Sequence, residues 1–248
     1  MFNGLNLNIF SFRNIDLARK VKYKPRKDNE KRRTRQESII RIGRTYNDFN
    51  DYLSIHPEAS IVEMDTVEGI KGGKVFLTLL FRNYNFMLIF IMDSKTMDEV
   101  EKVFIRIKKI IGIDTFKRLF EVILTDNGSE FFNPISIEVD YETGEVLSHV
   151  FYCDPYCSYQ KGSIEKNHEY IRYILPKYSS FNNLTQEDCD LIASHINSTS
   201  RTILNNKTPY EAVQTLISED IINKLNIKLI SPEHVNLSLS LLKKKINN

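Results

Sequence analysis

Residues 125–131 read TDNGSEF, and residues 160–168 read QKGSIEKNH. Asp126 directly follows an apolar stretch typical of a strand, and Glu165 lies just inside a predicted helix, thirty-nine positions further on. Asp65 ends another short apolar strand upstream. Two strand-end carboxylates and one helix carboxylate are what a site needs to hold two divalent cations against a phosphodiester. Hard oxygen ligands suit Mg²⁺ or Mn²⁺, and two ions about 3.5–4 Å apart stabilise both the attacking and the leaving oxygen.

The composition is that of a protein with a substantial core. The chain has 248 residues, of which 42% are hydrophobic, which is enough for one good-sized domain plus extensions. Its longest apolar runs, residues 75–81 and 86–92, are far shorter than the roughly 18 residues needed to span a bilayer. The N-terminal residues lack the features of a signal peptide. With only three cysteines and no zinc-type spacing, the sequence predicts a reduced, cytoplasmic protein.

The net charge of +2 hides a strong asymmetry. Residues 19–44 contain twelve basic and three acidic side chains, which gives this segment +9 and leaves −7 for the remainder. Arg32, Arg33 and Arg35 lie at its centre. Such a segment beside a mildly acidic body suggests an arm that binds DNA phosphates. The alternative is a solvated, disordered linker.

Hydrophobic periodicity predicts an ordered series of elements. The expected elements are a helix at 45–55, strands at 60–65, 74–81 and 86–92, helices at 97–111 and 115–120, strands at 121–125 and 150–152, and helices at 163–176 and 185–196. Three antiparallel strands, a helix, two further strands and then helices is the order of a ribonuclease-H-like α/β domain. We therefore expect a mixed five-stranded sheet flanked by helices.

Several local details accompany this order. Gly72-Gly73 has the chemistry of a tight two-residue hairpin turn. Ser94 is placed to cap the following helix, and Thr185 with Asp188 fits a capping box. Residues 137–152 are expected to contain an added hairpin.

Each acid also has a structural explanation. Asp126 begins an Asp-Asn-Gly turn, Asp65 is compatible with the solvated end of a strand, and Glu165 complements a helix dipole. Glu63 lies two residues before Asp65, faces the same side of the strand, and competes with it as a ligand. Together the acids are harder to dismiss, because all fall at element ends that this fold brings together.

Basic side chains near Glu165 are candidate phosphate contacts. They are Lys161, Lys166, His168 and Arg172. His168 lies one helical turn from Glu165, where it either touches the phosphate or metal shell or is simply exposed. The sequence has no Gly-x-Ser-x-Gly segment and no phosphate-binding Gly-x-x-x-x-Gly-Lys-Ser/Thr loop, so serine hydrolase and nucleotide triphosphatase chemistry find no support.

Several segments, in the same order, resemble the IS30 family of bacterial insertion-sequence transposases. The segments are residues 63–67 (EMDTV), 124–131 (LTDNGSEF), 151–156 (FYCDPY), 160–167 (QKGSIEKN), 184–188 (LTQED) and 206–211 (NKTPYE). The similarity covers roughly residues 15–240. It implies a retroviral-integrase-type catalytic core with an Asp-Asp-Glu triad, which falls on Asp65, Asp126 and Glu165. It also implies two Mg²⁺ or Mn²⁺ ions held by these residues, DNA as partner, a homo-oligomer on DNA, and a nucleoid-associated location in the bacterial cytoplasm.

Two features depart from the family pattern. Only about fifty residues precede the first catalytic strand, where family members carry a helix-turn-helix region that reads the terminal inverted repeats. The chain therefore looks like the C-terminal part of a transposase, from a truncated or frame-shifted copy. The second departure, around residues 138–147, lengthens the spacing between Asp126 and Glu165. The expected organisation is a basic arm and capping helix (1–55), an integrase-like core (56–215) and a helical tail (216–248).

The sequence thus predicts a transposase that cleaves DNA at element ends and then joins the freed 3′-hydroxyl to target DNA. One rival is a DNA-binding remnant without turnover. A second rival is a structure-selective nuclease on the same fold, which cuts branched DNA without joining ends.

Overall fold

A mixed sheet in the strand order β3-β2-β1-β4-β5 forms the centre of the fold. The computed structural model describes residues 39–242, and residues 1–38 and 243–248 lie outside this description. The strands are β1 (Ile61–Glu68), β2 (Val75–Phe81), β3 (Phe86–Met92), β4 (Val122–Thr125) and β5 (His149–Tyr152). The first three pair antiparallel, β4 runs parallel to β1, and β5 runs parallel to β4. The predicted ribonuclease-H-like sheet is confirmed.

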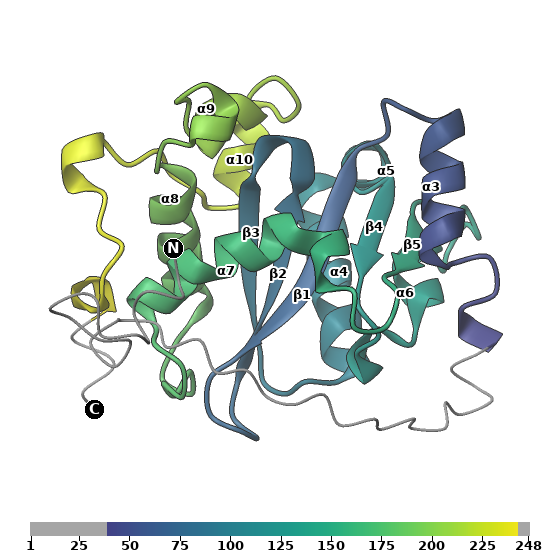
Figure 1. Cartoon of the computed structure of the whole chain (residues 1–248), viewed down its shortest axis with the longest axis horizontal. Helices are drawn as coiled ribbons and strands as arrows, with labels where there is room; N and C mark the ends of the chain where they lie inside the picture. The colour runs from purple at the N-terminus through teal and green to yellow at the C-terminus, as the bar shows by residue number, and fades with distance from the viewer. Residues whose placement is uncertain (1–38, 243–248) are drawn as a thin grey trace, which may run out of the picture. The chain divides into compact units, whose positions relative to one another are not determined.

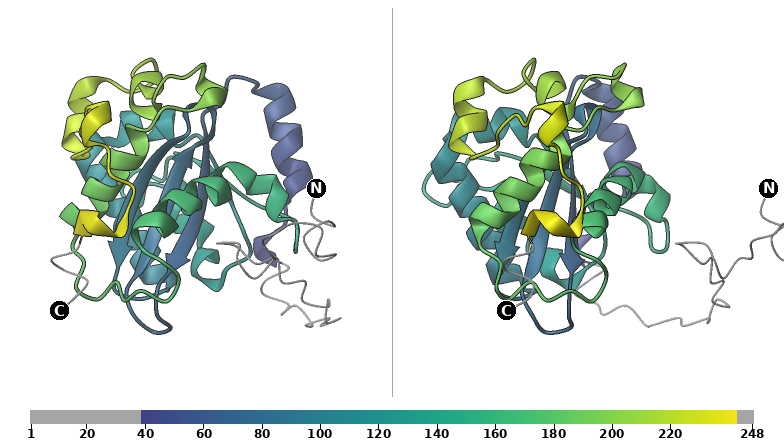
Figure 2. Two further views of the ribbon diagram at one scale, coloured as in Figure 1. Left: turned by 60° about the vertical axis from the view of Figure 1, so that its left-hand side comes forward. Right: turned by 90° about the vertical axis from the view of Figure 1, so that its left-hand side faces the viewer.

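Helices cover both faces of this sheet. They are α3 (Tyr46–Ile55), α4 (Met97–Ile111), α5 (Ile113–Leu119), α6 (Pro134–Glu138), α7 (Gly162–Ile174), α8 (Gln186–Asn197), α9 (Pro209–Val213) and α10 (Glu219–Lys224). Figure 1 and the turned views of Figure 2 show α7 on one side of the sheet and α4 on the other. A strand covered on both faces has to be apolar on both, and accordingly every residue of β2 is buried.

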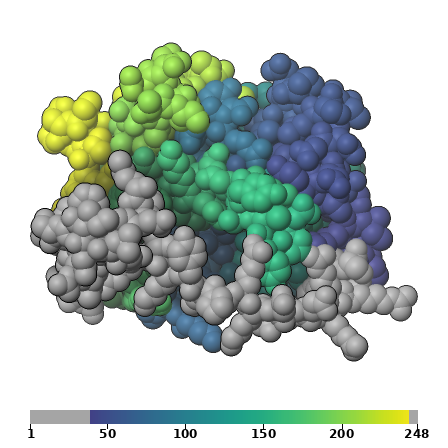
Figure 3. Space-filling view, in the orientation of Figure 1, coloured from purple at the N-terminus to yellow at the C-terminus, as the bar shows by residue number. Residues whose placement is uncertain are grey.

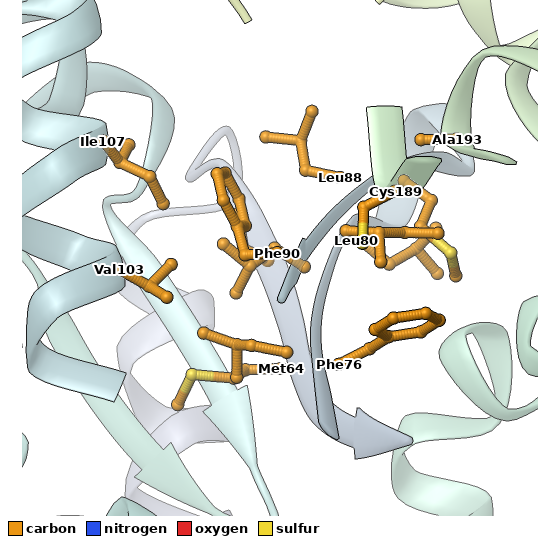
Figure 4. Packing of buried hydrophobic residues seen from close by; sticks show 14 of the residues in the cluster. Met64, Phe76, Leu80, Leu88, Phe90, Val103, Ile107, Cys189 and Ala193 are labelled. Atoms are coloured by element: carbon orange, nitrogen blue, oxygen red, sulfur yellow. The ribbon is translucent and has the colours of Figure 1, made fainter. Parts of the chain in front are cut away.

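The amphipathic pattern of α4 explains how it packs. Its buried residues recur at helical spacing, and they include Val103 and Ile107. Figure 4 shows these two side chains beside Phe90 of β3. On the α8 side, Cys189 lies next to Leu80 of β2. The packing of α4 and α8 on the sheet therefore follows directly from the spacing of apolar residues.

Helix α8 also satisfies the free edge of β3. Asn197 donates from its amide nitrogen to the Met87 carbonyl and accepts from the Met87 N–H, both at 2.8 Å. Gln186 donates to the Ile89 carbonyl at 2.8 Å and accepts from the Ile91 N–H at 3.2 Å. Two side-chain amides thus take the place of a neighbouring strand, which removes the pairing groups that an exposed edge would offer to another chain.

Two local predictions were wrong, and a third was right in part. Six residues separate β1 from β2, so Gly72-Gly73 is part of a longer loop, in which the Lys74 N–H binds the Asn182 side chain at 2.9 Å. Thr96, not Ser94, caps α4 by accepting from the Glu99 N–H. The expected added hairpin is present in a short form: α6 takes up residues 134–138, and Val139 then pairs antiparallel with Val146 around the predicted turn.

Other predictions hold. Thr185 and Asp188 form the predicted capping box, in which the Asp188 carboxylate accepts from the Thr185 N–H at 2.8 Å. Helix α3 covers β5, where Phe49 meets Phe151 edge to face with ring centroids 5.8 Å apart.

Ile222 of α10 is buried in the main core, although it lies beyond residue 215, where the helical tail was expected to begin. The domain boundaries stay a prediction. Between residues 39 and 242, no helix is long and apolar enough to cross a membrane.

We expect Asn197→Ala to lower the free energy of unfolding by about 2–5 kcal/mol, because it leaves a buried N–H and a buried carbonyl of β3 without partners. Urea denaturation measures the change. Asn223→Ala, on the exposed surface of α10, is the matched control and should stay within about 0.5 kcal/mol of the parent protein. A loss below about 1 kcal/mol for Asn197→Ala would show that the edge of β3 does not depend on this amide.

Candidate active site

Asp65 and Asp126 come from neighbouring parallel strands that separate at the site. The β1–β4 ladder runs from Ile61↔Val122 to Glu63↔Leu124 and stops there. Asp65 lies two residues further along β1, and Asp126 immediately follows β4. Because the ladder ends before both residues, their side chains share the opening at this end of the sheet. Asp65 is within β1, which continues to Glu68, and not at its end as the sequence suggested.

Each aspartate uses one carboxylate oxygen to accept a backbone hydrogen bond, and its other oxygen faces the site. Asp65 Oδ1 accepts from the Thr66 N–H, and Asp126 Oδ1 accepts from the Gly128 N–H, both at 2.8 Å. The hydrogen bond between Asp126 and Gly128 closes the turn that the Asp-Asn-Gly sequence predicts. The turn explanation and the ligand explanation for Asp126 are therefore compatible, since they use different oxygens of one carboxylate.

The free oxygens of both aspartates converge on the ammonium group of Lys161. Lys161 Nζ is 3.0 Å from Asp65 Oδ2 and 3.1 Å from Asp126 Oδ2, and the lysine is only 3% exposed. Burial, the largest single effect, disfavours the charged lysine, but the combined attraction of the two carboxylates outweighs it and raises the pKa of Lys161. The sequence places Lys161 on a phosphate, whereas the structure places it between two acids.

Glu165 stands in the first turn of α7 and is exposed. Burial of part of the side chain is the largest cause that raises the pKa of Glu165, and the nearby Lys161 opposes it. Within residues 39–242, no three acids, histidines or cysteines lie close enough together to hold one metal ion. The structure therefore joins Asp65 and Asp126 through Lys161 and does not bring Glu165 into the same group.

His168 packs against the sheet next to Asp65. Its Nε2 lies 2.8 Å from the Thr78 hydroxyl, which itself donates to the Asp65 carbonyl at 3.0 Å. Because that hydroxyl proton is used, His168 Nε2 is the donor and Nδ1 carries the lone pair, 3.9 Å from Asp65 Oδ2. Burial lowers the pKa of His168 to about 4, so the ring is neutral at pH 7.

Glu63 is not a free ligand, because its carboxylate anchors α7. Glu63 is 1% exposed, accepts from the Ile164 N–H at 2.7 Å and pairs with Arg82 Nε at 2.7 Å. Ile164 is in the first turn of α7, where N–H groups lack partners within the helix and the dipole favours an anion. Of these two candidate metal ligands, Glu63 fixes the start of α7, and Asp65 faces Lys161.

Glu130 is a participant that the sequence did not single out, although it lies in the TDNGSEF segment. It is 3% exposed and accepts from the Thr66 hydroxyl at 3.0 Å, with Lys95 Nζ at 3.3 Å. A Cβ at Gly128 would lie 2.6 Å from a Glu130 oxygen, so a side chain there would displace the Glu130 carboxylate. Glu130 thus ties the loop after β4 to the strand that carries Asp65.

The remaining predicted DNA contacts fall in different places. Lys166 is exposed on α7, while Arg172 is half-buried and donates to the Glu68 carbonyl at 2.8 Å. Arg32, Arg33 and Arg35 lie outside the described residues.

Sequence comparison gives distant relatives. No protein-family model matches the chain. It is 27% identical over 208 residues to the "Putative integrase ORF3" of Spiroplasma virus SpV1-R8A2 B, covering 83% of this chain and 59% of that protein. Over 152 residues it is 28% identical to the transposase InsI for insertion sequence element IS30C of Escherichia coli (strain K12), covering 61% of this chain and 37% of that protein. The chain is distantly similar to IS30 transposases. It spans less than two thirds of the length of either relative.

Among solved structures, the catalytic core domain of BIV integrase matches with a TM-score of 0.43 and 16% sequence identity. The match covers 63% of this chain and 95% of that one.

The Lys161 contacts predict a competition with divalent metal. Lys161→Met leaves two carboxylates facing each other without a cation, so we expect the free energy of unfolding in EDTA to fall by about 1–3 kcal/mol. Mn²⁺ should raise the melting temperature of this variant more than that of the parent protein, because no ammonium has to leave. Thermal unfolding with and without Mn²⁺ measures both effects.

Lys102→Met removes an exposed lysine of α4 that pairs with Glu99, and serves as the control. Equal Mn²⁺ shifts in Lys161→Met, Lys102→Met and the parent protein would argue against metal at this position.

Proposed function

We propose that this chain contains the catalytic core of a DNA transposase, which cleaves DNA at transposon ends and joins the 3′-hydroxyl to target DNA. The observation that carries the proposal is the convergence of Asp65 Oδ2 and Asp126 Oδ2 on one cation, with Glu165 on the adjoining helix. The distant similarity to the IS30C transposase supports it.

The residues present fit a divalent metal. The ammonium of Lys161 shows that a cation is accommodated between Asp65 and Asp126, and both acids offer the hard oxygen that Mg²⁺ and Mn²⁺ prefer. Asp65 and Asp126 would hold the metal, and Glu165 of α7 would become a further ligand after moving toward them. When bound, such ions act as Lewis acids on the attacking and leaving oxygens of a phosphodiester.

The other residues of the site have roles of their own. Glu63 and Arg82 keep the start of α7 on β1, which sets the position of Glu165 relative to Asp65. Neutral His168 holds Thr78 and borders Asp65 without adding positive charge. Lys161, when it leaves the two aspartates, carries its charge toward the substrate phosphate. The exposed basic groups of the same region then bind the DNA backbone.

One observation favours the rival of a DNA-binding protein without turnover. Lys161 forms ion pairs with both aspartates, and these contacts oppose metal binding. Under this alternative the two acids stabilise the fold through the lysine and no phosphodiester chemistry follows. DNA binding alone does not separate the two hypotheses, since both predict it.

Strand transfer separates them. Duplex oligonucleotides with a free 3′-hydroxyl are mixed with supercoiled plasmid and Mn²⁺, and joined or nicked plasmid is measured. We expect product from the parent protein. Asp126→Asn and Glu165→Gln should each lower the rate by about a hundredfold or more, because ligand loss removes several kcal/mol of transition-state stabilisation.

The control is Asp93→Asn, an acid with an 82% exposed side chain outside the site, which should keep its activity. If no variant and no parent protein gives product while DNA binding persists, the binding protein without turnover replaces our proposal. Nicking without joining would favour the structure-selective nuclease.

A further inference from the structure

A polar pocket lies against α7, apart from Asp65 and Asp126. Its volume is about 260 Å³. Residues from three places line it, chiefly Asn85 after β2, Ser163, Lys166, Asn167 and Tyr170 of α7, and Arg201 in the segment after α8. The α7 residues are spaced i, i+3, i+4 and i+7, so they form one face of the helix. None of the lining residues is acidic.

Arg201 is the unusual group in this pocket. It is 7% exposed, and within residues 39–242 it forms no ion pair with an acid. Its Nη2 donates to the Ile196 carbonyl at 3.1 Å, while Nε and Nη1 are buried and have no hydrogen-bond partner in the described structure. A guanidinium has five N–H donors and keeps its charge, so leaving it buried and unpaired costs free energy.

The aromatic contact of Arg201 is too weak to explain its burial. Its guanidinium carbon lies 4.0 Å from the centroid of the Tyr170 ring. A cation–π contact offsets only part of the free-energy cost of burying an ion. Burial accordingly lowers the pKa of Arg201. After a small movement of the Arg201 side chain, an anion bound in the pocket would supply the missing partner for Nε and Nη1.

The surroundings of Arg201 favour an anion further. Lys166 adds a second positive charge at the pocket, and Ser163 adds a hydroxyl donor. Tetrahedral phosphate matches this combination of a guanidinium, an ammonium and a hydroxyl.

We propose that the pocket of Arg201, Lys166 and Ser163 binds a backbone phosphate of the DNA strand that passes through the active site. This inference rests on the proposed function. Glu165 and His168 lie on the opposite side of α7 from Ser163 and Asn167, given 3.6 residues per turn. A strand leaving the aspartates would cross the exposed side of α7 near Lys166 and reach Arg201 a few nucleotides further along. Figure 3 shows that α7 is open to solvent on this face.

The test measures DNA and phosphate binding separately, without catalysis. Fluorescence anisotropy gives the affinity for a labelled oligonucleotide over a series of salt concentrations. For Arg201→Gln and for Lys166→Gln we expect several-fold weaker binding and a salt slope smaller by about 1, as the loss of one phosphate contact requires. Arg118→Gln, an exposed arginine of α5 with the same change in charge, should bind like the parent protein.

Inorganic phosphate is the second probe. At constant ionic strength it should raise the melting temperature of the parent protein relative to chloride, and Arg201→Gln should lose this shift. Lys166 is exposed, so Lys166→Gln tests the pocket even if Arg201→Gln fails to fold.

The outcomes separate the two proposals. Unchanged DNA affinity and salt slope in both pocket variants would overturn this inference, even if strand transfer succeeds. A phosphate shift combined with unchanged DNA binding would show a free-phosphate site and overturn the assignment to DNA. If the variants lose DNA affinity but the parent protein shows no strand transfer, the phosphate pocket is supported. Only the catalytic proposal is then rejected.

Discussion

The buried carboxylate of Glu63 is the contact on which the rest of the site depends. It comes from β1, accepts the Ile164 N–H of α7 and pairs with Arg82, whose Nη2 also donates to the Gln160 carbonyl at 3.1 Å. One acid therefore fixes the start of α7 on the strand that carries Asp65. Lys161 and Glu165, on either side of Ile164, are held in place by the same interaction. A charge buried to this degree is stable only while both partners remain, which makes the position of α7 well defined.

The second constraint is electrostatic. Asp65 and Asp126 are brought together where the β1–β4 ladder ends, and two carboxylates this close repel each other unless a cation separates them. Lys161 serves as that cation in the described structure. Under the proposed function, a divalent ion would have to replace both of these ion pairs, so the same lysine would compete with the metal.

Much of the fold was predictable because local patterns and tertiary packing agree. The apolar runs of β2 and β3 and the amphipathic spacing of α4 follow directly from the sequence. One error arose where a distant residue decides the outcome. Asn182 binds the Lys74 N–H and shapes the loop that Gly72-Gly73 seemed to close tightly. Likewise, no local pattern indicates that Lys161 lies between two acids, since both partners come from other strands.

The two functional faces of α7 follow from its place in the fold. Its buried residues, including Ile164 and Ile171, face the sheet and leave a side free on either flank of that contact. Glu165 and His168 occupy the flank toward Asp65, and Asn167 and Tyr170 occupy the flank toward Arg201. Buried polar groups beside a packed helix need hydrogen-bond partners, and His168 is hydrogen-bonded to Thr78. Two buried nitrogens of Arg201 have no partner within the described residues. This difference is why we assign an anion from outside the chain to the flank of α7 toward Arg201.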